Sequence, residues 1–158
     1  MVRIDQGEIM ANSRFAQAHD RIRPVHIALA AAIVALGCVL RVQGAMGEMW
    51  LDEVWSLDFA LRMDTWHEAF WTNFSDNSHP INTVWLHLMG ANREPWIYRF
   101  ASISFSTLAI VAAGWTIVRH TTGNAPTRML TAMLLVAVLY PFVHFGSEAR
   151  GYAQVTLF

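Results

Sequence analysis

Three long apolar blocks constrain the fold of this chain more than any other feature. They cover residues 25–42, 99–118 and 129–145, and another apolar segment begins at residues 152–158. A helix needs about 20 predominantly apolar residues to cross the hydrocarbon core of a bilayer. Helices of a soluble bundle would show polar faces at a period of about 3.6 residues, whereas these blocks are apolar on all sides. The sequence therefore predicts an all-α fold of polytopic transmembrane helices.

The composition agrees with a membrane protein and excludes several functions. Hydrophobic residues make up 54% of the 158 residues, charged residues make up 15%, and the formal net charge is −1. This charge, without a basic run interleaved with aromatic residues, argues against nucleic acid as a partner. The single cysteine, Cys38, excludes an intramolecular disulfide and a cysteine-based metal site, and we expect it to be a packing residue.

The distribution of arginine predicts how the chain is oriented in the membrane. Residues 1–24 carry four arginines and the short connection 119–128 carries two, whereas the loop 43–98 holds only Arg62 and Arg93. Because basic residues stay on the cytoplasmic side, we expect a cytoplasmic tail at 1–24 and an extracytoplasmic loop at 43–98. The tail is polar and has no clear cleavage site, so the first span is expected to be a retained anchor. The protein is then a multi-pass protein of the cell membrane, and residues 146–151 lie on the outer face with the loop.

The outer loop contains two predicted helices. Residues 51–70 read as one amphipathic helix rich in tryptophan, which favours the interface between bilayer and water. Residues 81–90 are apolar, but ten residues reach only about 15 Å at a rise of 1.5 Å per residue, half of a bilayer core. We therefore expect interfacial or juxtamembrane helices here rather than a span.

An acidic pair, Asp52 and Glu53, follows the first span and lies between tryptophans. Neighbouring helical residues point about 100° apart, so the two carboxylates would serve different partners. One could act as a general base toward a hydroxyl while the other holds a substrate group or a divalent cation. The alternative is that both are ordinary acidic residues in a solvated first helical turn, where the helix dipole favours them.

Two further polar clusters fall on the same predicted face. In the first, Pro80 suits the first position of a helix capped by Ser78 or His79, and a histidine at a helix N-terminus favours an anionic group such as phosphate. In the second, Ser147 reads as the N-cap of another helix with a glutamate in its first turn. Arg150 follows it near the membrane, where a guanidinium pairs with a carboxylate or a phosphate. His26 and His144 near the span ends read as residues satisfied by their neighbours, and the remaining histidines, His67, His87 and His120, read as surface or interfacial residues.

In order and spacing, these motifs resemble the N-terminal part of membrane glycosyltransferases of the C-type fold. This superfamily includes the protein O-mannosyltransferases and the lipid A aminoarabinose transferases. The resemblance covers roughly residues 25 to 158 and is carried by three stretches: Leu51-Asp52-Glu53, His79-Pro80 and Glu148-Ala149-Arg150-Gly151-Tyr152.

The resemblance implies transfer of a sugar from a polyprenyl-phosphate donor to a hydroxyl of a lipid, glycan or protein acceptor, beside membrane lipid. Asp52 would be the general base or acceptor-orienting carboxylate, and Glu53 would place the acceptor or a divalent cation, the one candidate cofactor. The expected substrate-binding residues are those of the other two motifs: His79, Glu148, Arg150 and Tyr152.

The resembled enzymes have many more spans, so we expect this chain to be a truncated or partial sequence. Two other readings stay open. One is a non-catalytic small membrane subunit or anchoring protein whose outer loop binds a partner. The other is a transporter fragment, which would place ionisable residues within the spans.

Overall fold

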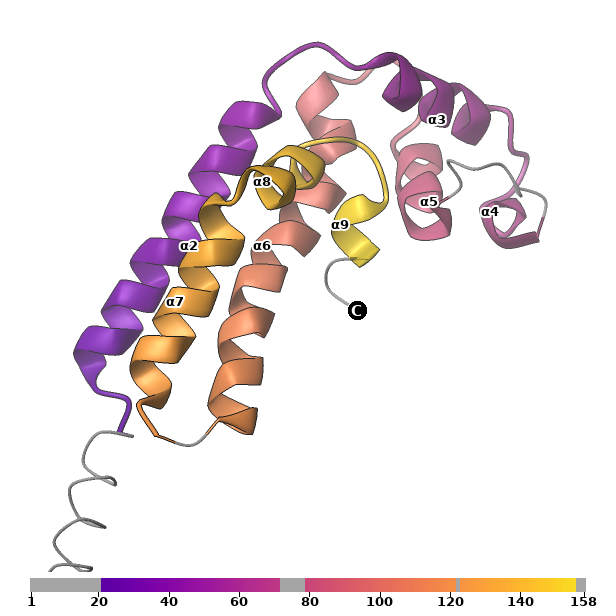
Figure 1. The fold of residues 1–158 in the computed structure, drawn as a ribbon. Helices are drawn as coiled ribbons and strands as arrows, with labels where there is room; N and C mark the ends of the chain where they lie inside the picture. The colour runs from indigo at the N-terminus through magenta and orange to yellow at the C-terminus, as the bar shows by residue number, and fades with distance from the viewer. Residues whose placement is uncertain (1–20, 72–78, 122, 156–158) are drawn as a thin grey trace, which may run out of the picture.

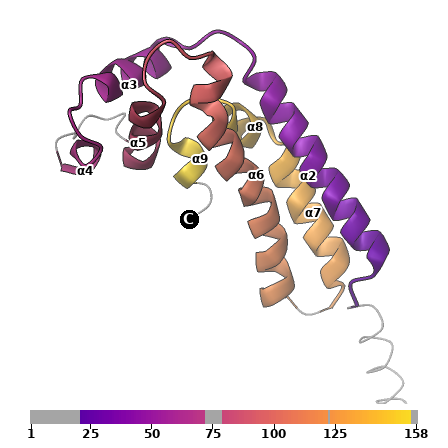
Figure 2. The ribbon, with the colours of Figure 1, turned by 180° about the vertical axis from the view of Figure 1, so that it is seen from behind.

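The computed structural model of the protein describes residues 21–71, 79–121 and 123–155, and every element in these ranges is a helix. Three long helices pack side by side: α2 (Pro24–Gly44), α6 (Pro95–His120) and α7 (Ala125–Val138) (Figure 1). The all-α prediction is therefore confirmed for the described residues. Figure 2, which shows the molecule from behind, gives the same arrangement of these three helices.

Two of these helices are long and apolar enough to cross a membrane, namely α2 and α6. They correspond to the predicted spans 25–42 and 99–118 and extend a few residues beyond them. Both begin with a proline at the start of the helix, where its missing N–H costs nothing and its fixed φ already suits a helix. Cys38 is half-buried and lines an apolar cavity of about 580 Å³ between the two helices. These features are consistent with a membrane location.

The predicted third span, 129–145, is wrong as a single helix. The chain forms α7 and then α8 (Tyr140–Gly146), and the two are bent by 56° at Leu139, which has an extended backbone with φ −62° and ψ 129°. Pro141 explains the break, because its ring has no N–H to donate and clashes with the preceding helical turn. The bent pair together is still long and apolar enough to count as one broken span or a re-entrant segment.

Arg41 of α2 satisfies the carbonyls that this break leaves free. Its side chain is fully buried, and it donates to the carbonyl oxygens of Val136 (3.0 Å) and Ala137 (3.2 Å) at the end of α7. It also donates 2.7 Å to Ser106 Oγ of α6. Unpaired carbonyls in an apolar surrounding are costly, so one guanidinium links the three long helices at the bend.

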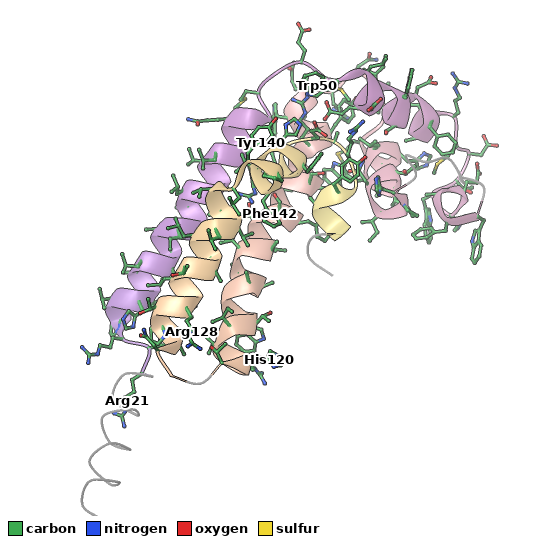
Figure 3. All side chains as sticks on the ribbon, viewed as in Figure 1. Arg21, Trp50, His120, Arg128, Tyr140 and Phe142 are labelled. Carbon is green, nitrogen blue, oxygen red and sulfur yellow. The ribbon has the colours of Figure 1, made fainter. Side chains whose placement is uncertain are left out.

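The two ends of the bundle differ in chemistry. Arg21, His120 and Arg128 lie at one end, while Trp50 and Tyr140 lie at the other (Figure 3). Arg119, beside His120, places its guanidinium 4.5 Å from the ring centre of Trp115. Of the arginines that the sequence placed on one side of a membrane, Arg21 and Arg128 therefore do share one end of the bundle.

Three shorter helices extend from the tryptophan end: α3 (Leu51–Leu61), α4 (Glu68–Trp71) and α5 (Pro80–Met89). The predicted single helix over 51–70 is wrong, because the chain leaves the helix at Arg62. The turn before α4 is closed by Glu68, whose Oε1 accepts hydrogen bonds from the Thr65 N–H and hydroxyl, both at 3.0 Å. The short helix expected at 81–90 is confirmed as α5.

The C-terminal part of the described chain turns back toward α6. The helix α9 covers Tyr152–Val155, so part of the segment expected at 152–158 lies outside the described residues, as do Ser78 and most of the tail 1–24. The prediction that Ser147 is an N-cap is wrong: Ser147 follows the end of α8, and its hydroxyl donates 2.7 Å to the carbonyl of Val143 within that helix.

Candidate functional site

The first turn of α3 separates the two adjacent carboxylates. Trp50 is the N-cap of the helix, and its N–H donates 2.8 Å to Glu53 Oε2, which fixes the start of the helix at Leu51. Glu53 is completely buried, whereas the Asp52 side chain is 40% exposed. The expectation that the two residues serve different partners agrees with this arrangement.

Glu53 forms a buried ion pair with Arg99 of α6. Arg99 Nε donates 2.9 Å to Oε1 and Nη2 donates 2.6 Å to Oε2. The N–H groups of Trp50 and Ala149 also donate to this carboxylate. A carboxylate offers about four lone-pair positions, so these four hydrogen bonds occupy it fully. This geometry leaves no oxygen of Glu53 for a cation or an acceptor.

Arg99 uses its remaining donors on the connection between α2 and α3. Its guanidinium donates to the carbonyl oxygens of Ala45 (2.7 Å), Gly47 (2.6 Å) and Glu48 (2.7 Å). One buried guanidinium thus joins the end of α2, the start of α3 and the N-terminal half of α6. The sequence analysis missed this residue and treated it only as the start of a span. A buried arginine needs a carboxylate partner, but the local sequence around Arg99 does not show that this partner is Glu53, 46 residues earlier.

Asp52 lies on the other side of the same helical turn and forms an ion pair with Arg150. The side chain of Arg150 is mostly buried (16% exposed), and its guanidinium lies 5.4 Å from the ring centre of Tyr152. Its Nη1 is 3.6 Å from Glu148 Oε2, within ion-pair range but outside hydrogen-bond range. The structure therefore brings together three of the predicted site residues: Asp52, Glu148 and Arg150.

Glu148 is the unusual member of this group. Its side chain is 8% exposed, and its Oε2 has no hydrogen-bond partner among the described residues. Its Oε1 is 3.3 Å from Nε2 of His144 on α8. Burial raises the pKa of the Glu148 carboxyl, and the neighbouring His144 partly opposes that shift. A carboxyl with a raised pKa and an unused oxygen is a feature that often marks a binding site.

These side chains line a small pocket of about 120 Å³. Its lining residues are Trp50, Asp52, His144, Glu148 and Arg150. A water molecule occupies about 30 Å³ in the liquid, so the pocket holds a group of only a few heavy atoms, such as one phosphate. His144, which the sequence analysis set aside as a satisfied residue, is the imidazole in this pocket.

His79 and Tyr152 contact each other beside the site instead of lining the pocket. Their ring centres are 5.0 Å apart in an edge-to-face arrangement. His79 is the N-cap of α5, as expected, and burial lowers the pKa of its imidazole. A side chain on Gly151 would overlap the His79 side chain, so the close approach of the backbone to His79 requires glycine at this position.

The backbone of the segment that carries Glu148 and Arg150 accepts hydrogen bonds from side chains of two helices. Asn82 of α5 donates 2.8 Å to the Ala149 carbonyl, and Ser102 of α6 donates 2.9 Å to the Arg150 carbonyl. Because Ala149 also donates to Glu53, the segment is fixed to three helices. The positions of the two charged side chains are therefore set by packed elements.

No group of three or more His, Cys, Asp or Glu side chains converges as a metal site within the part of the chain that the structure describes. Arg150 lies between Asp52 and Glu148, where a cation bridging the two carboxylates would otherwise sit. Comparison of the chain with protein-family models, with curated proteins and with solved structures gave no match.

Proposed function

We propose that this protein is a membrane glycosyltransferase that transfers a sugar from a polyprenyl-phosphate donor to an acceptor hydroxyl, or the N-terminal part of such an enzyme. The observation that carries the proposal is the pocket in which Asp52, Glu148 and Arg150 meet. The pocket combines an accessible carboxylate, a guanidinium and a carboxyl with an unused oxygen. It lies at the tryptophan end of the bundle, opposite the arginine-rich end (Figure 3).

The orientation in the membrane follows from the charge of the two ends. Basic residues remain in the cytoplasm and tryptophans gather at interfaces, so the end with Arg21 and Arg128 is cytoplasmic. The pocket then lies at the extracytoplasmic surface, within reach of a donor whose prenyl chain remains in the bilayer. The exposed rings of Trp50 and Trp55 support an interfacial position for α3.

In the proposed reaction, Asp52 is the general base. Its carboxylate accepts the proton of the acceptor hydroxyl while that oxygen forms a bond to the anomeric carbon of the sugar. The bond from this carbon to the donor phosphate breaks, and polyprenyl phosphate leaves with the electron pair. Arg150 balances the negative charge on the departing phosphate.

Glu53 has a structural role in this proposal. Its carboxylate is fully bonded, and it orients Asp52 by fixing the first turn of α3 and the segment at Ala149. His79 and Tyr152 shape the wall behind Arg150. The resemblance implied that Glu53 places the acceptor or a cation, whereas in this proposal Asp52 alone acts on the acceptor and Glu53 supports the fold.

The test replaces Asp52 by asparagine and measures transfer of labelled sugar from a polyprenyl-phosphate sugar in membranes that contain the protein. General base catalysis contributes about 10²–10⁴-fold, so Asp52→Asn should reduce transfer by at least about 10²-fold. The matched control is Asp58→Asn, since Asp58 is on the same helix and forms an exposed pair with Arg62. Equal transfer by the two variants would refute the base role.

The second candidate, a non-catalytic membrane subunit, is favoured by the exposed aromatic rings of α3, α4 and the turn between them. Trp55, Trp66 and Trp71 are 58%, 50% and 76% exposed, and aromatic residues are frequent in protein interfaces. This candidate predicts that replacing these three tryptophans by alanine abolishes co-purification of a partner, while Asp52→Asn has no effect on that partner or on growth.

A further inference from the structure

The unused oxygen of Glu148 is the starting observation. The side chain is more than nine-tenths buried, yet Oε2 lacks a hydrogen-bond partner among the described residues. A buried polar atom without a partner costs free energy comparable to a lost hydrogen bond, and such atoms in native proteins commonly receive a bond from a ligand or water. The oxygen belongs to a residue that lines the pocket.

The neighbouring imidazole is held in a fixed orientation. The ring of His144 stacks on Tyr140 with centres 5.1 Å apart and planes 12° apart. Phe145 lies on another side of the same ring, with centres 5.3 Å apart. This packing places His144 Nε2 3.3 Å from Glu148 Oε1, while Oε2, at 3.6 Å from Arg150 Nη1, receives no hydrogen bond from a described residue.

We propose that Glu148 and His144 form a proton-holding pair that, together with Arg150, binds the phosphate group of the donor beside Asp52. This inference rests on the proposed function, because it names the residues that would hold the leaving group. A neutral Glu148 donates its Oε2 hydrogen to a phosphate oxygen, while His144 Nε2–H donates to Oε1 and fixes the proton on Oε2. His144 is thus a positioning residue, and Glu148 is the one that touches the donor.

The charges in the pocket require this protonation. Asp52 and Arg150 compensate each other, so an ionised Glu148 would give the pocket a net negative charge and repel phosphate. Protonation of Glu148 removes that charge. The size agrees as well, because about 120 Å³ accommodates a phosphate group and leaves the sugar and prenyl chain outside.

The groups that face Glu148 come from four parts of the chain. His144 of α8 and Arg99 of α6 lower the pKa of its carboxyl, while burial and Glu53 of α3 raise it, and burial dominates. Arg150 lies at ion-pair distance. The net shift is upward, so the carboxyl keeps its proton at a higher pH than in an unfolded chain.

Anion binding should therefore weaken as the pH rises. The experiment measures binding of sulfate and of a short-chain prenyl phosphate to the full chain in lipid nanodiscs by calorimetry between pH 5 and 8. Sulfate does not titrate in this range, and a phosphate monoester gains negative charge near pH 6, which would strengthen binding at higher pH. A fall in affinity of about tenfold or more for both probes can therefore come only from the protein.

Two variants assign the effect to the pair. Glu148→Gln stays neutral at every pH and should keep its affinity at pH 8 within a few-fold of the value at pH 5. His144→Gln should bind sulfate about tenfold more weakly than the wild type at pH 5. His67→Gln is the matched control, because His67 is exposed in the turn before α4, where it contacts Thr65 and Trp66 and lines no part of the pocket, and it should match the wild type throughout.

The wild-type profile tests the proposal even if a variant fails to fold. An affinity that is constant or rises with pH, or equal binding by the wild type and a folded His144→Gln, would overturn it. Failure of the proposed function gives a different result: the pH-dependent binding would persist while no sugar transfer depends on Asp52. If transfer depends on Asp52 but sulfate binding does not depend on Glu148 and His144, the pair alone is refuted.

Discussion

The two sides of the first turn of α3 contain the same kinds of residue and differ in how completely these are bonded. On the inner side, Glu53 and Arg99 are fully buried and every lone pair of the carboxylate accepts a hydrogen bond. On the outer side, Asp52 and Arg150 form a partly exposed pair, and the adjacent Glu148 keeps an oxygen without a hydrogen-bond partner in the described chain. Adjacent carboxylates thus have opposite surroundings.

This difference teaches that saturation of hydrogen bonds separates a structural ion pair from a binding pair better than residue type does. A fully bonded buried pair holds helices together but cannot accept a ligand without breaking. A partly bonded pair at a pocket keeps donors and acceptors for a substrate. The variants below test this distinction through stability, which should respond strongly on the inner side.

The largest expected effect follows from removing Arg99. Arg99→Met would leave the Glu53 carboxylate buried without its cation, and breaking one partner of such a pair typically costs about 3–5 kcal/mol. We expect a clear loss of stability, measured as the thermal midpoint of the protein in nanodiscs, together with loosening of residues 45–48 in hydrogen exchange.

The control for Arg99 is an arginine–carboxylate pair on the surface. Arg62 and Asp58 are 2.5 Å apart, with side chains 76% and 54% exposed, and pairs of this kind contribute about 0–1 kcal/mol. Arg62→Met should therefore leave the midpoint nearly unchanged. If Arg99→Met and Arg62→Met have equal effects, the inner pair is not the structural link that its geometry indicates.

A smaller effect is expected at Gly151, where the inner and outer sides meet. A methyl group there would overlap the His79 ring, and overpacking of this kind costs about 1–3 kcal/mol. Gly151→Ala should lower the thermal midpoint and shift Arg150, which weakens its pair with Asp52. Gly47→Ala serves as the control because nothing lies within 4 Å of its added methyl group; a larger loss there than at Gly151 would contradict the packing argument.

The apolar pattern predicted the long helices because burial in lipid requires continuous apolar segments, and α2 and α6 follow from that requirement alone. The breaks were harder to predict. Pro141 is a visible signal for a break. Whether the chain breaks into two helices or forms one kinked helix depends on which groups donate hydrogen bonds to the freed carbonyls. Here the partner is Arg41, which lies about a hundred residues earlier in the sequence.

The candidate site was predicted in part for a similar reason. Asp52, Glu148 and Arg150 stood out by type and by their expected side of the membrane, and the structure brings them together. Arg99 and His144 were missed, because local sequence shows neither the carboxylate opposite an arginine nor the ring on which a histidine stacks. Which member of the acidic pair faces inward depends on the helix starting at Leu51, a boundary that the sequence alone leaves uncertain by a residue or two.

The smallest expected effect concerns His79, whose ring lies beside Gly151, and it appears as a pH dependence of stability. Burial lowers the pKa of His79 below its ordinary value of 6.5. Above the pKa of the unfolded chain, His79 is neutral in both the folded and the unfolded state, so its titration contributes nothing to the free energy of unfolding. As the pH falls below 6.5 the unfolded chain takes up the proton first, so the folded state loses stability down to the folded pKa. Replacing His79 by glutamine should remove this loss.

Glu148 has the opposite sign, since its raised pKa gives stability that is present below 4.5 and lost as the pH rises through the folded pKa. The two contributions overlap, so the useful quantity is the difference in thermal midpoint between wild type and variant at each pH. For His79→Gln the thermal midpoint of the variant should rise relative to that of the wild type as the pH falls below 6.5. For Glu148→Gln, the thermal midpoint of the variant should instead rise relative to that of the wild type as the pH increases above 4.5. If the difference in thermal midpoint changed with pH in the same way for His79→Gln and Glu148→Gln, the opposite pKa shifts of His79 and Glu148 would be refuted.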